Sequence, residues 1–366
     1  MSPPEELPWD LVGEILSRVP TKSLARFRAV CKQWNAIWDE KSFLDNYLSR
    51  TRPQFIIRTN SHIRSVEINL NDEDQVSPIE VRDITLDSPN GIRTSIHYCD
   101  GFLLFTMKKR GFAIWNPWSR QKRFIENHEF IFYGVGYDNT RPETGYKIFG
   151  VLPSIIYECK SDAWKFLSGP CDKSRMQKLD SMVSLNGNLY FHAFDSKTRE
   201  CLIQSFDFSK DIFKTICVLP SNEDIISTRA LEVFRGDRLS MLTQSYLTRK
   251  VEILVTKQKI DVNGEAIVWI NFMTVSIPNF PRLQPHFLGF QPTYFVDNID
   301  EKRLFVCTCD ETAHACIYIV KGDVFRKIPI DYEIDRWSFL YTSFISYIPS
   351  FVSIPCIQRE EQGLQV

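Results

Sequence analysis

Residues 307–316 bring together the side chains that most often hold a metal ion in proteins. Three cysteines and one histidine, Cys307, Cys309, His314 and Cys316, stand within this short stretch. Thiolates and imidazoles are the usual ligands of structural zinc. If residues 310–313 form a hairpin loop, strand alternation places Cys309 opposite His314 and Cys307 opposite Cys316, with all four side chains on one face. No other stretch of the sequence resembles a metal site as closely.

The geometry of a sheet nevertheless argues against zinc at this position. Neighbours on one strand face lie about 6.5–7 Å apart and cross-strand side chains about 4.5–5.5 Å apart, in a nearly flat rectangle. Tetrahedral zinc requires donors that converge to about 2.0–2.3 Å from the metal. Cysteine also packs well as a small apolar residue. We therefore predict that these four side chains form an apolar core face, and that the protein holds no metal and no cofactor.

Motifs of the common enzyme classes are absent from the sequence. There is no Gly-x-Ser-x-Gly elbow, no Gly-x-x-x-x-Gly-Lys-Ser/Thr phosphate loop and no His-Glu-x-x-His pair. A Cys–His nucleophile pair would meet only in the fold, so the sequence leaves that arrangement open. The expectation is a protein with no catalytic residue. The alternative is a hydrolase built on a β-propeller with a helical N-terminal extension.

Charge and hydropathy exclude further classes of function. The formal net charge is −1, and the longest basic tract is Lys108-Lys109-Arg110, so nucleic acid is not the expected partner. Residues 1–10 do not resemble a signal peptide, and no window approaches the ~18 consecutive apolar residues of a membrane span. The ten cysteines form no compact framework and are expected to be reduced thiols. An intracellular protein of the nucleus or cytoplasm is expected.

The N-terminal fifty residues carry two apolar stripes at helical spacing. The first consists of Val12, Ile15, Leu16 and Val19, and the second of Leu24, Phe27, Cys31, Trp34 and Trp38. Pro8 suits the first turn of one helix, Pro20 ends it, and Thr21 is a candidate N-cap for the next. Helices this short cannot bury both stripes against each other. A partner surface is therefore expected.

A dense series of residues in this region follows a known order: Leu7-Pro8, Asp10-Leu11, Ile15-Leu16, Arg18-Val19-Pro20, Lys22, Leu24, Arg26-Phe27-Arg28, Val30-Cys31-Lys32 and Trp34. This series resembles the F-box, the helical module by which substrate receptors dock on the small adaptor of cullin–RING ubiquitin ligases. The resemblance implies an adaptor-binding face made of Leu7, Pro8, Leu11, Ile15, Leu16, Val19, Pro20, Leu24, Phe27, Val30, Cys31 and Trp34. The other interpretation is a helical hairpin that only packs on the following domain.

Beyond Pro53 the apolar period changes from helical to alternating, which is typical of strands. Turn dipeptides that tolerate positive φ punctuate the region at Asn90-Gly91, Asp100-Gly101, Asn186-Gly187 and Asn263-Gly264. Four strand anchors, Leu103, Leu189, Leu239 and Leu304, lie 86, 50 and 65 residues apart, and residues 145–151 lie near the middle of the first gap. A period of ~40–60 residues favours four-stranded propeller blades over the alternative, a two-sheet sandwich.

Several motifs in the strand region carry a second resemblance: Ile114-Trp115-Asn116-Pro117-Trp118, Gly134-Val135-Gly136-Tyr137-Asp138, residues 157–164, residues 185–190, residues 205–208, residues 317–320 and residues 346–350. They resemble successive signatures of the plant F-box-associated domain. Trp118 and Ala163 depart from its pattern. From the residues themselves we expect Trp115 in the core, a turn at Asn116-Pro117, and close backbone approach at Gly134 and Gly136, which flank a strand.

Together the two resemblances imply an α+β multidomain protein. Residues 1–50 form the helical F-box, residues 53–354 a mainly-β domain with an irregular β-propeller, and residues 355–366 a tail. The implied function is that of a non-catalytic substrate-recognition subunit of an SCF-type ubiquitin ligase. Its implied partners are the ligase adaptor, through it the cullin and RING subunits, and an unknown protein substrate. The substrate is expected on loops at one end of the β domain.

Overall fold

The computed structural model describes fifteen segments of the 366-residue chain. They are residues 7–59, 62–68, 79–84, 92–107, 111–126, 131–140, 145–151, 154–167, 181–195, 197–219, 228–260, 267–283, 291–297, 302–333 and 342–354. The predicted turns at Asn90-Gly91 and Asn263-Gly264 and the predicted tail at 355–366 lie outside these residues.

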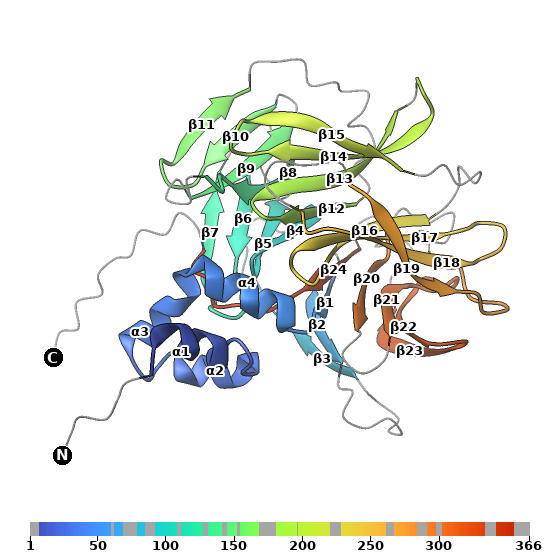
Figure 1. Cartoon of the computed structure of the whole chain (residues 1–366), viewed down its shortest axis with the longest axis horizontal. Coiled ribbons are helices and arrows are strands. Elements are labelled where there is room, and N and C mark those ends of the chain that lie inside the picture. The colour runs from blue at the N-terminus through green and yellow to red at the C-terminus, as the bar shows by residue number, and fades with distance from the viewer. Residues whose placement is uncertain are drawn as a thin grey trace.

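A module of short helices precedes the strands. It consists of α1 (Trp9–Leu16), α2 (Thr21–Phe27), α3 (Lys32–Ala36), the 3-10 turn η1 (Ile37–Asp39) and α4 (Lys41–Arg50). In Figure 1, α4 lies against the β domain, and α1, α2 and α3 lie on its outer side. No helix among the described residues is long and apolar enough to cross a membrane.

The strands form six four-stranded antiparallel sheets within the described residues. The first sheet holds β24 (Ser343–Tyr347), β1 (Gln54–Arg58), β2 (Ile63–Ile68) and β3 (Ile79–Asp83). The second holds β4 (Ile92–Cys99), β5 (Phe102–Met107), β6 (Phe112–Trp115) and β7 (Lys122–Ile125), and the third β8 (Ile131–Tyr137), β9 (Tyr146–Val151), β10 (Ile155–Glu158) and β11 (Ala163–Phe166). The fourth holds β12 (Met182–Leu185), β13 (Asn188–Asp195), β14 (Glu200–Asp207) and β15 (Ile212–Val218). The fifth holds β16 (Thr228–Phe234), β17 (Arg238–Gln244), β18 (Val251–Thr256) and β19 (Trp269–Val275), and the sixth β20 (Thr293–Asp297), β21 (Arg303–Cys309), β22 (His314–Lys321) and β23 (Val324–Glu333).

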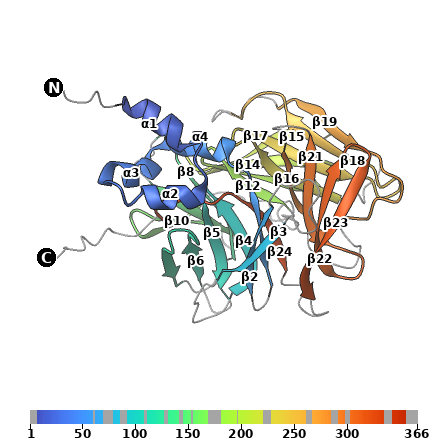
Figure 2. The same ribbon diagram turned by 90° about the horizontal axis from the view of Figure 1, so that it is seen from below.

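These sheets are the blades of a six-bladed β-propeller (Figures 1 and 2). The strands β24, β4, β8, β12, β16 and β20 contact one another in a ring around a central channel. The ring closes because β24 pairs with β1, with Ile345 opposite Ile56. The last strand of the chain therefore completes the first blade, a closure that leaves only short edges. The predicted propeller is confirmed, and the alternative of a two-sheet sandwich is wrong.

The four predicted anchors occupy equivalent places in the propeller. Leu103, Leu189, Leu239 and Leu304 lie in β5, β13, β17 and β21, each the second strand of its blade. Residues 145–151 overlap β9, which is the second strand of the blade in the wide first gap. Phenylalanine rings stack between neighbouring blades: Phe149 and Phe206 have centroids 4.5 Å apart. The period read from the sequence is therefore the period of the blades.

Two of the predicted turns join the first and second strands of their blades. Asp100 and Gly101 have φ of 47° and 96°, and Asn186 and Gly187 have φ of 49° and 76°. Positive φ at both positions is the requirement of the tight hairpin turn that these dipeptides favour. A side chain at Gly136 would overlap the carbonyl oxygen of Gly187, which confirms close approach between blades. Gly134 and Gly136 lie within β8, however, and do not flank it.

The segment after β24 joins the two parts of the chain. The side-chain amide of Asn116 donates to the carbonyls of Ser350 (3.0 Å) and Val352 (2.9 Å), while its oxygen accepts from the Trp118 amide (2.9 Å). Asn116 therefore shapes the predicted turn and also holds residues 348–354, which we call the C-terminal strap. Trp115 is 4% exposed, as expected for a core residue.

Candidate functional site

The inner side of the helical module is an apolar cluster that the C-terminal strap completes. Its buried members are Leu16, Leu24, Ile37, Trp38, Phe43, Leu44 and Tyr47 from the helices and Phe351 and Val352 from the strap. The Trp38 ring meets Phe351 edge to face, with centroids 5.4 Å apart. The chain therefore covers a large part of the two stripes itself, with residues of its own C-terminal strap.

A second apolar surface of the same module faces solvent. Leu7, Leu11, Ile15 and Val30 are 61%, 51%, 53% and 63% exposed. Leu11 and Ile15 stand one helical turn apart on α1, so their side chains lie on one face. Pro8, Pro20 and Cys31 are also exposed. Large apolar side chains that gather on a surface mark a site of protein–protein contact.

The remaining members of the predicted adaptor face lie deeper. Leu16 and Leu24 are 3% and 2% exposed and belong to the inner cluster, so they do not form part of the exposed surface. Val19, Phe27 and Trp34 are half-buried against that cluster, and the rings of Phe27 and Trp34 meet at 5.5 Å. These five residues support the exposed surface from beneath.

Two polar details of the module were not predicted correctly. The thiol of Cys31 accepts the Trp34 amide at 3.4 Å and so caps α3, a role that its place in an apolar stripe does not reveal. Thr21 is the first residue of α2 and not its N-cap, which is Pro20. The Thr21 hydroxyl instead meets the Tyr47 hydroxyl at 2.5 Å. Tyr47 in turn donates to the Pro349 carbonyl at 2.8 Å, a bond from helix to strap.

Helix α4 covers one end of the propeller channel. The ammonium group of Lys41 lies 5.0 Å from the centre of the Tyr137 ring, and Arg52 forms a 2.6 Å ion pair with Asp297. A Cβ at Gly236 would lie 3.3 Å from the backbone of Ser49, so the turn between β16 and β17 fits directly against the helix. The helical module and the propeller therefore share an extensive interface at this end.

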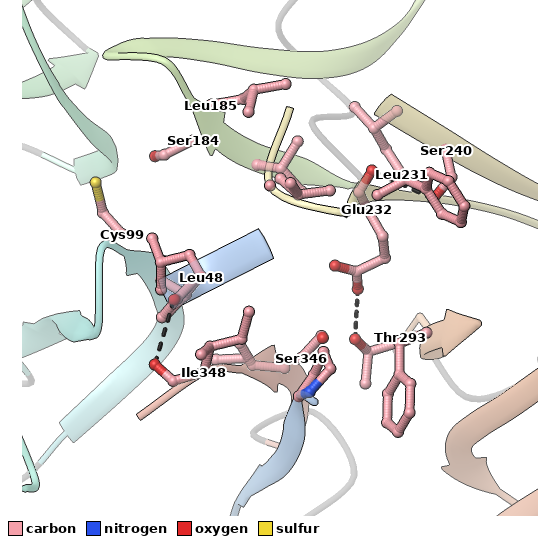
Figure 3. Close-up of a pocket in the computed structure, with 18 of the residues that line it drawn as sticks. Leu48, Cys99, Ser184, Leu185, Leu231, Glu232, Ser240, Thr293, Ser346 and Ile348 are labelled. Atoms are coloured by element: carbon pink, nitrogen blue, oxygen red, sulfur yellow. Dashed lines mark hydrogen bonds between the residues drawn. The ribbon is translucent and has the colours of Figure 1, made fainter. Parts of the chain in front are cut away.

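The channel holds a cavity of about 1030 Å³. Its wall combines apolar, polar and charged residues, and Figure 3 shows Leu48, Leu185, Leu231, Ser184, Ser346 and Glu232 around it. Burial raises the pKa of the Glu232 carboxyl to about 8, although hydrogen bonds from Thr293 and the Tyr294 backbone oppose the shift. Burial also lowers the pKa of His97, another lining residue, to about 4.

The cysteine-rich hairpin differs from its prediction by one residue in register. Cys309 pairs with Ala315 and Thr308 pairs with Cys316. The loop is closed by Asp310 and His314, with the Asp310 amide donating to the His314 carbonyl at 2.9 Å. Such a slip turns side chains to the opposite face. Cys307 and Cys309 therefore lie in one core cluster and Cys316 in another.

The predicted apolar core face holds for Cys307 and Cys309, but it does not include the other two residues. Cys316 is buried on the opposite side of the sheet, and the side chain of His314 is 48% exposed. Within the described segments, no three His, Cys, Asp or Glu residues are grouped to hold a metal. The eight described cysteines are free thiols.

Comparisons with known proteins agree with this architecture. Residues 54–354 match the family model of the F-box associated beta propeller domain, and residues 4–46 match that of the F-box domain. The Arabidopsis thaliana "Putative F-box protein At3g16590" is 44% identical, covering 96% of this chain and 99% of its own length. "F-box protein At3g17710" from the same plant is 41% identical over 96% of this chain and 97% of its own length. "Protein SUPPRESSOR OF NIM1 1", also from Arabidopsis thaliana, is 40% identical over 94% and 99%.

Proposed function

This chain belongs to the F-box proteins that carry an F-box associated beta propeller domain, and on that basis we propose that it is the substrate-recognition subunit of an SCF-type ubiquitin ligase. The observation that carries the proposal is the exposed apolar surface of Leu7, Leu11, Ile15 and Val30, which lies within or beside the short helices of the F-box. This surface docks on the ligase adaptor, and through the adaptor the chain joins the cullin and RING subunits. Residues 1–50 thus serve docking, and residues 53–354 recruit the protein target.

The interface between the helical module and the propeller supports a fixed position of the protein target relative to the adaptor. Tyr47, Trp38 and Phe351 join helix to strap through a hydrogen bond and ring contacts. A target held on the propeller is then presented at a constant position relative to the adaptor. Ubiquitin transfer needs such a constant position because reacting groups must be brought within a few ångströms of each other.

The strand order indicates which end of the propeller is available for a target. In an up-and-down blade, the turn between the second and third strands lies at the opposite end from the turn between the first and second. Since α4 covers the end that holds Gly236, the target binds at the other end. The turn between β17 and β18 lies there, with Leu247 76% exposed and the Arg282 guanidinium 4.2 Å from the Tyr246 ring centre.

A hydrolase built on the same propeller is the less favoured function. Nucleophilic cysteines need a lowered pKa, so that the thiolate forms at neutral pH. Burial instead raises the pKa of the thiols of Cys99, Cys307 and Cys309, and raises that of Cys316 to about 12. These four thiols stay protonated, which suits packing and not catalysis.

The docking proposal is tested with the variant Leu11→Asp, Ile15→Asp in a pull-down with the purified ligase adaptor. Burying one such side chain is worth about 1.5–3 kcal/mol, so placing two carboxylates there should abolish binding. Because both residues are half exposed in the free protein, the variant should keep the circular dichroism and melting temperature of the wild type.

The control is Leu247→Asp, which puts one such carboxylate on an exposed leucine of the propeller. It should bind the adaptor as the wild type does. Retention of the adaptor by the double variant would overturn the proposed docking surface.

A further inference from the structure

The channel of the propeller holds a half-buried acid that the proposed docking on the adaptor does not involve. Glu232 lies on β16, lines the cavity of about 1030 Å³, and accepts a hydrogen bond from the hydroxyl of Thr293 on the neighbouring β20. Figure 3 shows its carboxyl group directed across the gap between these two strands. Among the described residues, no lysine, arginine or histidine forms an ion pair with it. Its charge, when present, is therefore uncompensated.

Most of the cations that line the same cavity have carboxylate partners, and Arg235, which also lines it, lies over the Phe234 ring at 5.4 Å from its centre. Arg52 pairs with Asp297, Arg50 with Glu14, and Lys41 with Asp45 at 2.8 Å. Arg238 bonds Asp237 at 3.3 Å. These pairs lie at the α4 end of the channel, where the charges balance locally. Asp100, a further lining acid, lies near Lys41 and accepts a hydrogen bond from the Tyr146 hydroxyl at 2.7 Å. Among the described lining acids, Glu232 is the one with no cation beside it.

The wall around Glu232 is suited to an organic group. Leu48 and Ile348 supply apolar surface, and Ser184 and Ser346 supply hydroxyl groups. In pockets that bind small molecules, apolar side chains cover much of the ligand and polar groups fix its orientation. An uncompensated carboxylate in such a wall selects a positive charge, because an ion pair in low dielectric is far stronger than in water.

We infer that the channel binds a small organic cation, a primary amine or guanidine with an apolar substituent. Its charged group pairs with Glu232, and its apolar part lies against Leu48 and Ile348. The inference does not rest on the ligase role, because binding can be measured on the isolated chain. A lysine or arginine side chain of a bound protein offers the same charged group, so the experiment includes both sources.

The test is isothermal titration of the full chain at pH 7 with 4-phenylbutylamine. The neutral probe 4-phenylbutan-1-ol has the same apolar part, and a capped lysine, N-acetyl-lysine methylamide, represents a side chain of a protein. The amine should bind at least tenfold more tightly than the alcohol. Since burial raises the pKa of the Glu232 carboxyl to about 8, pairing with the amine at pH 7 should also release protons, which the dependence of the heat on buffer reveals.

The variant Glu232→Gln keeps the shape of the side chain and removes its charge. It should bind the amine at least tenfold more weakly, release no proton, and bind the alcohol as before. The control Glu252→Gln removes a carboxylate that pairs with Lys250 on the outer part of the same blade, and it should bind the amine as the wild type does.

Three results would overturn the inference: equal amine binding by wild type and Glu232→Gln, equal binding of amine and alcohol, or no binding of either cation at millimolar concentration. If the capped lysine bound and 4-phenylbutylamine did not, the cation site would be supported, and its ligand would be a side chain of a protein and not a small molecule.

Discussion

Replacing Phe351 by alanine should loosen the helical module from the propeller. Phe351 is 5% exposed in the C-terminal strap, and its ring contacts Trp38 at 5.4 Å and Trp118 at 5.9 Å between centroids. The guanidinium of Arg28 lies 4.7 Å from the same ring. One side chain thus joins the helices, the second blade and the strap, so its removal affects the interface more than either part alone.

The magnitude follows from the burial of the ring. Buried Phe→Ala substitutions cost about 3–5 kcal/mol, and this range includes edge-to-face contacts worth about 0.5–1.5 kcal/mol each. A loss of about 3–5 kcal/mol at the interface corresponds to roughly a 10²–10⁴-fold fall in hydrogen-exchange protection wherever opening of the interface exposes amides. That fall should be found in α4, while β13, on the fourth blade, should keep its protection.

The assay is hydrogen exchange followed by mass spectrometry on the full chain, with Phe166→Ala as the matched control. Phe166 lies on the outer strand β11 and is 62% exposed, so its removal should change stability by no more than about 0.5 kcal/mol. A change of less than threefold in α4 protection on Phe351→Ala would refute the reasoning. It would mean that the strap does not hold the module in place.

Two further predictions concern single residues of the propeller. Burial alone would raise the pKa of the Asp310 carboxyl, but hydrogen bonds from Lys327, Thr312 and the His314 backbone lower it to about 2. The ionised carboxylate therefore stabilises the folded state above pH ~4, and this contribution is lost as pH falls toward 2. Asp310→Asn should therefore lower the free energy of unfolding by roughly 2 kcal/mol at pH 7 and by nearly nothing at pH 2, and a pH-independent difference in urea unfolding would contradict this. Gly136→Ala should cost about 1–3 kcal/mol, since the methyl group overlaps the Gly187 carbonyl and the Phe208 ring. The control Gly13→Ala places a methyl on α1 3.8 Å from Ile37, where there is room, and it should not destabilise the protein.

Local chemistry explains why the blades could be predicted from the sequence. Asn186-Gly187 indicates a hairpin because few residue pairs accept positive φ at two successive positions. Leu189 and Leu239 then mark the strands that follow such turns, and their separation gives the blade period. Each of these signals depends on residues close together in the chain.

Closure of the ring has no such local signal. Residues 343–347 read as an ordinary strand, and only the folded structure pairs them with residues 54–58. The same holds for the strap, whose Phe351 meets Trp38 across more than three hundred positions. Contacts between residues so far apart in sequence depend on the geometry of the whole ring, and the sequence of one segment does not determine that geometry.

The register of the cysteine hairpin was mispredicted for a reason that lies in one side chain. The alternation of residues fits two loops almost equally well. One is a four-residue loop of residues 310–313, and the other is a three-residue loop of residues 311–313 closed by Asp310 and His314. The Asp310 carboxylate decides between them, because it accepts the Thr312 amide at 2.8 Å and the His314 amide at 2.9 Å, and Ala313 takes φ of 69°. A three-residue loop that ends in a left-handed residue is a common hairpin connection.

Helical periodicity identifies the residues of the predicted adaptor face only in part. A stripe at helical spacing identifies the apolar arc of α1, yet the arc is wide enough to serve two surfaces at once. Leu11 and Ile15 lie on its exposed side, and Leu16, the next residue in the chain, lies on the side that packs beneath Trp38 and the strap. Sequence spacing cannot separate these sides, because the strap that covers one of them comes from the far end of the chain. We therefore propose that docking uses the exposed residues of the predicted face, and we expect a substitution at Leu16 to lower stability and one at Ile15 to weaken docking.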